Sequence, residues 1–273
     1  MHGAINSVNI NLLGKKMSQW NDEYYEIIDF YFWEPQHIGR SKTEKSRYKN
    51  MADVKNHILN MEVSLNHQLN IFFRLAPEDF INKLVKNYFH NSFDDKYLFH
   101  GENEWKQYVP AEETQPDLFL SGESTNLAIE LKLGAKSNME QVAKYLLLHQ
   151  LNNQSYNKEK QPYLLYISPS SFSSLWAEKF KSKSELISCF KENNFTKLKE
   201  KTKNNISEST SDSALNLIDE VEIEAITYKQ FHELLIKYRD NIDMTQKYSD
   251  TIDSLFLGLI NELESRSATK VGT

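Results

Sequence analysis

The chain has 273 residues, of which 40% are hydrophobic and 12% aromatic, which is enough for one large domain or for a core with a smaller appended unit. The single cysteine excludes a disulfide framework and a cysteine-based zinc site. The net charge of −6 argues against a large sequence-independent contact with nucleic acid. No apolar run reaches the length of about 18 residues that predicts a membrane span, and no secretory leader is recognisable, so we expect a cytoplasmic protein that does not enter a membrane.

The composition divides the chain into an extension over residues 1–50 and a main domain over residues 51–273, with its core at about residues 95–240. Aromatic and acidic residues crowd positions 20–33, which we expect to pack on the core or to contact a partner protein or a second copy of the chain. Basic residues crowd the loop at 39–50, which is a candidate for phosphate contact.

The first half of the main domain predicts two helices followed by strands. Apolar spacing predicts one helix over 52–73, and a proline followed by Glu78 and Asp79 predicts a second from Pro77 to Phe89. A first core strand is expected around 105–109. A strand over 116–120, a turn at 121–124 and a strand over 126–133 then predict a hairpin.

The second half predicts alternating strands and helices. A helix that includes residues 141–145 precedes an apolar run at 163–167, which predicts a buried central strand. The next expected elements are a helix over 170–181, a lysine-rich stretch over 179–203, a flexible loop over 204–213, an edge strand over 221–226, a helix over 228–238 capped by Thr227, and a last helix over 249–264. The lysine-rich stretch could follow a phosphate backbone or could be a solvated surface.

The predicted hairpin gathers three residues that suit chemistry on phosphate. It brings Asp117 close to Glu130, and Glu130 and Lys132 share a face because side chains two apart on a strand point the same way. Two carboxylates suit Mg²⁺, or Mn²⁺ in its place, because such cations take oxygen ligands and retain water. Lys132 could act as a point charge or as a proton acceptor beside them.

These residues resemble a known family. Pro116-Asp117, followed by Glu130-Leu131-Lys132, resembles the motif of the PD-(D/E)XK nuclease superfamily. Gln141 and Tyr145 resemble the Gln-x-x-x-Tyr element of its RecB-like branch, and both can face the site because they are four apart on a helix. The resemblance implies an α/β, restriction-endonuclease-like fold with a mixed central β-sheet flanked by α-helices.

The resemblance also implies roles for individual residues. Asp117 and Glu130 would hold the metal, Lys132 would act on water and phosphate, and Gln141 and Tyr145 would position the substrate strand or the lysine. An upstream helix of this family often donates a further glutamate. Glu62 is the first choice, and Glu78 is the second because its position at a helix start has a purely structural explanation.

The sequence therefore predicts a metal-dependent nuclease that hydrolyses phosphodiester bonds, in DNA rather than RNA, with a role in phage defence, restriction or repair. The alternative is a catalytically inactive module of the same fold that binds nucleic acid or a protein partner. Two structural readings also stay open: Glu130 and Lys132 could be a charge pair on a solvent-exposed strand, and the Gln-x-x-x-Tyr element could combine a packed tyrosine with a surface glutamine. Histidine spacing suited to zinc and a phosphate-binding glycine loop are both lacking in the sequence.

Overall fold

A computed structural model describes residues 20, 24–25, 58–59, 61–89, 94–99, 117–134, 136–176, 179–193, 195–202, 204 and 206–271. The predicted strand at 105–109, the basic loop at 39–50 and Pro116 lie outside these residues, as does most of the extension over 1–50. None of the described helices combines the length and the apolar character that crossing a membrane requires.

Five strands form one mixed sheet in the order β1-β2-β3-β4-β5. Their bounds are β1 Leu98–Phe99, β2 Leu118–Ser121, β3 Thr125–Leu131, β4 Gln161–Ser168 and β5 Glu222–Thr227. The first three strands pair antiparallel, and β3, β4 and β5 pair parallel. Every residue of β3 is buried, and so is β4 after its first residue, because helices cover both faces of the sheet. The expected α/β fold with a mixed sheet flanked by helices is confirmed.

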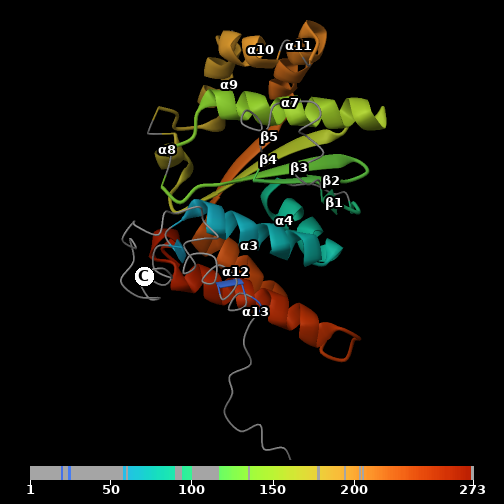
Figure 1. Ribbon diagram of the computed structural model, residues 1–273, viewed down its shortest axis with the longest axis vertical. Coiled ribbons are helices and arrows are strands. Elements are labelled where there is room, and N and C mark those ends of the chain that lie inside the picture. The colour runs from blue at the N-terminus through green and yellow to red at the C-terminus, as the bar shows by residue number, and fades with distance from the viewer. Residues whose placement is uncertain are drawn as a thin grey trace, which may run out of the picture.

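Two layers of helices enclose the sheet (Figure 1). One layer holds α7 Met139–Tyr156, with α9 Lys183–Lys191, α10 Thr196–Thr202 and α11 Glu208–Asn216 beyond it. The other holds α3 Glu62–Leu75, α4 Glu78–Phe89, α12 Tyr228–Arg239 and α13 Ser249–Ser265. Alternate residues of β3 serve the two layers: Leu127 and Ile129 pack toward α3 and α12, whereas Ala128 packs toward α7.

The hairpin, the buried strand β4, the edge strand β5 and the helices α4, α12 and α13 follow the predictions within one or two residues. The cap of α12 is also confirmed, since Thr227 and Gln230 form a reciprocal capping box.

Three predicted elements are confirmed only in part. The helix expected over 52–73 is interrupted, because Met61 is extended (φ −89°, ψ 127°) and α3 starts at Glu62. The helix expected over 170–181 is reduced to α8 Phe172–Leu175, because the next residue, Trp176, leaves helical geometry and packs its ring against Tyr166 in the core. The flexible loop expected over 204–213 contains the start of α11.

The polar composition of α11 concealed a packed helix. Ser207 caps it by accepting a hydrogen bond from the Thr210 backbone N–H (3.1 Å). The buried side of α11 consists of Ser211 and Ala214, whose small side chains suit close packing in the layer that contains α7. Lys199 of the neighbouring α10 pairs with Asp212 at 2.6 Å, so part of the lysine-rich stretch is engaged by the acids beside it.

Candidate active site

The hairpin register sets the geometry of the candidate site. Leu118 pairs with Ile129, so Asp117, one residue earlier, lies opposite Glu130. At the other end of the hairpin, Asp95 holds the turn by accepting hydrogen bonds from the Ser124 and Thr125 backbone N–H groups (3.0 and 2.8 Å). The predicted approach of Asp117 and Glu130 is therefore present in the fold.

Glu130 and Lys132 form a buried ion pair. The Lys132 Nζ lies 2.5 Å from Glu130 Oε1, and the two residues are only 4% and 8% exposed. The reading of these residues as a charge pair on a solvent-exposed strand is therefore wrong. Burying an ion pair costs desolvation free energy that a surface pair avoids. The pair is therefore a candidate for a functional role.

The helix α7 supplies two further donors to Glu130. Gln141 donates from Nε2 to Glu130 Oε1, and Tyr145 donates its hydroxyl to Oε2. The Gln141 side chain is oriented by Ser137, whose hydroxyl donates to Gln141 Oε1 (3.1 Å), and the helix start is capped by Asn138. The reading of Gln141 as a surface glutamine without a partner in the site is therefore wrong, because both residues of the pair reach Glu130.

Asp117 is anchored from two sides. Its Oδ2 accepts from the Leu131 backbone N–H (2.8 Å), and its Oδ1 accepts from Asn66 Nδ2 (2.5 Å). Its backbone carbonyl accepts from Asn70 Nδ2 (2.9 Å). Burial raises the pKa of Asp117 well above its usual value, the charge of Glu130 raises it further, and the Leu131 N–H and the charge of Lys132 only partly oppose this.

Glu62 approaches the same end of the hairpin from α3. Its Oε2 accepts a hydrogen bond from the Leu133 backbone N–H (2.8 Å), and its charge acts on both Asp117 and Lys132. Glu78 is exposed in the first turn of α4, where the helix dipole favours a carboxylate. Of the two predicted glutamates, Glu62 is the one within electrostatic reach of Asp117 and Lys132.

Lys132 is held in its charged form. Burial lowers the pKa of Lys132, but the charge and hydrogen bond of Glu130, together with the charges of Glu62 and Asp117, outweigh burial, so the net pKa is raised. A protonated amine cannot accept a proton. In the chain without a bound cation, the arrangement therefore favours Lys132 as a point charge and disfavours it as a general base.

The charge balance of the site suits a divalent cation. Three carboxylates, those of Glu62, Asp117 and Glu130, face one ammonium group, so full ionisation leaves two uncompensated negative charges. Among the described residues, no three His, Cys, Asp or Glu side chains are grouped closely enough to be a ready-made metal site. Mg²⁺ does not need such a group, because one or two carboxylates with water and substrate phosphate are its usual protein ligands. The donor chemistry of Asp117 and Glu130 therefore fits this cation.

Asn66 and Asn70 are the site residues that sequence reasoning missed. They follow Glu62 at intervals of four residues, which places all three on one face of α3. That spacing was visible in the sequence. It gave no reason to connect α3 with Asp117, which lies 51 residues after Asn66.

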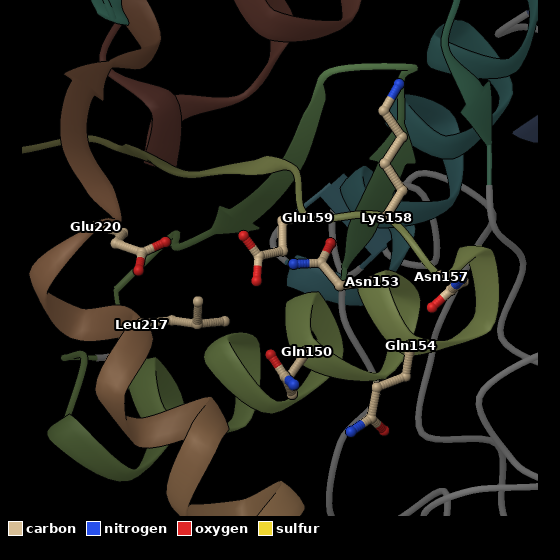
Figure 2. Close-up of a pocket in the computed structure, with 8 residues that line it drawn as sticks. All are labelled: Gln150, Asn153, Gln154, Asn157, Lys158, Glu159, Leu217 and Glu220. Atoms are coloured by element: carbon tan, nitrogen blue, oxygen red, sulfur yellow. The ribbon is translucent and has the colours of Figure 1, made fainter.

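A polar cavity of about 360 Å³ lies elsewhere, near the C-terminal end of α7 (Figure 2). Its walls come from Gln150, Asn153, Gln154, Asn157, Lys158, Glu159, Leu217 and Glu220. Gln141 and Tyr145 belong to the opposite, N-terminal part of α7. The cavity therefore does not contain the candidate active site.

No protein-family model matches this chain, and no curated protein matches it significantly.

Proposed function

We propose that this chain is a metal-dependent nuclease that hydrolyses phosphodiester bonds, in DNA rather than RNA. One observation carries the proposal: Asp117, the buried Glu130–Lys132 pair and Glu62 converge at one end of the β2–β3 hairpin, where three carboxyl groups face one ammonium group. The order of hairpin, helix and buried parallel strand is the one implied by the resemblance to the PD-(D/E)XK superfamily. A role in phage defence, restriction or repair in the cytoplasm remains part of this proposal by analogy only.

Asp117 and Glu130 would hold Mg²⁺ or Mn²⁺, with Glu62 as an additional acid at the site. When bound, the cation would stabilise charge on the scissile phosphate and activate water. The Lys132 ammonium would bind a phosphate oxygen and offset its charge. Gln141 and Tyr145 would hold the Glu130 carboxylate in place. Burial and the charge of Glu130 raise the pKa of Tyr145 well above its usual value, so its hydroxyl remains a donor at neutral pH.

Cleavage of labelled single- and double-stranded DNA and RNA, with Mg²⁺ and with a chelator, tests this function. The Lys132→Ala variant removes the amine of the site, and Lys237→Ala removes an exposed amine of α12 as the matched control. We expect cation-dependent cleavage of DNA by the wild type and the control, and a loss of at least about 100-fold in Lys132→Ala, the lower end for a positioned electrostatic group. Equal cleavage by Lys132→Ala and wild type would defeat the proposal.

One observation favours the alternative of an inactive module that binds nucleic acid or a protein partner. Both carboxylate oxygens of Glu130 already accept from protein donors, namely Lys132, Gln141 and Tyr145. A fully satisfied buried network can serve stability alone. Calorimetry with Mg²⁺ and Mn²⁺ separates the two functions, because only the nuclease needs cation binding that disappears in an Asp117→Asn, Glu130→Gln double variant.

A further inference from the structure

We propose that Asn66 is a positioning residue for the cation site and that Asn70 assists it. This inference rests on the proposed nuclease function and deepens it by assigning residues that the motif does not include. Glu62, Asn66 and Asn70 form one polar face of α3, and each contacts a different group at the end of the hairpin. The helix thereby fixes Asp117 relative to Glu62.

The two asparagines hold different parts of Asp117. Asn66 donates to its carboxylate (2.5 Å), whereas Asn70 donates to its backbone carbonyl (2.9 Å). The Leu131 N–H occupies the other carboxylate oxygen (2.8 Å), so the plane of the carboxylate is set by one donor on each side. Asp117 stands immediately before β2, outside the regular ladder, and side-chain contacts must supply the constraint that strand pairing supplies to Leu118.

The other half of the Asn66 amide supports the same assignment. Its Oδ1 is buried and has no hydrogen-bond partner within the described part of the chain. A buried acceptor of this kind loses its hydration without compensation, so it needs an explanation such as water or an ion. Mg²⁺ retains several waters, and a water held by the cation is a strong donor. Asn66 therefore donates to Asp117 through its Nδ2 and keeps its Oδ1 as an acceptor, which would serve the water of a hydrated cation held by Asp117.

This contact is part-buried and lies beside fully buried groups. Tyr228, fully buried at the start of α12, is within electrostatic reach of Glu62, Asp117 and Glu130, and its hydroxyl also has no hydrogen-bond partner within the described residues. Weakly hydrated surroundings strengthen a charge-assisted hydrogen bond and make its loss costly. Loss of the Asn66 donor would therefore change the orientation of the Asp117 carboxylate.

Titration of Mn²⁺ into the full-length chain, followed by calorimetry and by the paramagnetic resonance spectrum of the bound ion, tests the assignment. We compare wild type with Asn66→Ala, Asn70→Ala and the matched control Asn87→Ala, which removes an exposed helical asparagine in α4. We expect Asn66→Ala to weaken cation binding about 10- to 100-fold, the usual effect of removing a residue that orients a metal ligand. Asn70→Ala should lose less, Asn87→Ala should bind like wild type, and Asn66→Gln should recover part of the loss.

The DNA cleavage rate of Asn66→Ala should return toward the wild-type rate as the cation concentration rises, because the loss lies in cation affinity. Wild-type cation affinity in Asn66→Ala would overturn the inference while the nuclease function stands. No cation binding by the wild type would instead overturn the proposed function and, with it, the role assigned to Asn66.

A double-mutant cycle with Asp117→Ala, measured by urea unfolding without metal, tests the contact independently of the cation. The effect of Asn66→Ala on the unfolding equilibrium constant should be at least about 2-fold smaller in the Asp117→Ala background, since coupled contacts show non-additive effects of that size or larger. Additive effects would mean that Asn66 does not hold Asp117, and would overturn the inference.

Discussion

The substitution Asp117→Asn should remove a loss of stability that the metal-free protein undergoes as the pH rises. Burial and the charge of Glu130 raise the pKa of Asp117 well above its usual value. At a pH above the pKa of Asp117 in the unfolded chain, the Asp117 carboxyl group therefore keeps its proton in the folded chain and has released it in the unfolded chain. Stability contributed by this proton is complete at acid pH and is lost as the pH rises through the folded pKa.

The magnitude follows from one proton. Within that pH interval, the free energy of unfolding of the wild type should fall relative to Asp117→Asn by about 1.4 kcal/mol for each pH unit. The substitution also replaces one carboxylate oxygen by an NH₂ group, which changes the hydrogen bonds to Leu131 and Asn66. Asn66 can adapt by rotating its amide, because its Oδ1 has no other partner among the described residues. Any remaining cost is a constant offset and does not alter the slope.

Urea unfolding monitored by tryptophan fluorescence from pH 4 to 8, in chelator, measures the difference between the two proteins. Other groups, such as His149, titrate in both and cancel. Mg²⁺ at 100 times its dissociation constant should then stabilise the wild type by about 2.7 kcal/mol at pH 8 and leave Asp117→Asn nearly unchanged. A difference between the two proteins that stays flat from pH 4 to 8 would refute the account of Asp117 as a buried acid under repulsion.

Three further substitutions test the fold. Arg266→Met should lower the free energy of unfolding in urea by about 3–5 kcal/mol, because it leaves the buried Glu262 carboxylate without its ion-pair partner. In the wild type, Arg266 Nε lies 2.6 Å from Glu262 Oε1. A decrease below about 1 kcal/mol would contradict this prediction. Gly122→Ala should lower stability by about 1–3 kcal/mol in thermal unfolding, because the new Cβ would overlap Asp95, and an unchanged midpoint would show that the turn adapts. Burial lowers the pKa of His149 to about 3, so between about pH 3 and pH 6.5 the free energy of unfolding rises with pH by about 1.4 kcal/mol per pH unit. His149→Leu should remove this rise. The same dependence of the urea midpoint on pH in wild type and His149→Leu would contradict the prediction.

The predictions that succeeded rest on local periodicity. The alternation in residues 126–133 assigned Ile129 and Leu131 to one face and Glu130 to the other, and the structure agrees because a strand has no other way to arrange them. The capped helix after Thr227 follows equally from neighbouring residues, since the cap bonds only groups three positions away. In both cases the interacting groups are close in sequence.

The predictions that failed depended on distant partners. The polar segment 204–213 was predicted as a loop, but its second half belongs to α11, whose small residues Ser211 and Ala214 are buried. Trp176, predicted inside a helix, instead leaves helical geometry and packs its ring against Tyr166. Propensity is a weak guide where tertiary packing decides the outcome. Exposure is likewise a tertiary property, which is why the Glu130–Lys132 pair could be read as a surface feature from the sequence.

The sequence by itself determined which acids and which amine could meet, because Asp117, Glu130 and Lys132 share one hairpin and Gln141 and Tyr145 share one helix face. Only the tertiary structure decided that these groups are buried, that Lys132 stays charged, and that α3 brings Glu62, Asn66 and Asn70 to Asp117. The reason is physical: hydrogen-bond registers and helix faces follow from neighbouring residues, whereas burial and charge coupling arise only when segments far apart in the chain exclude water together.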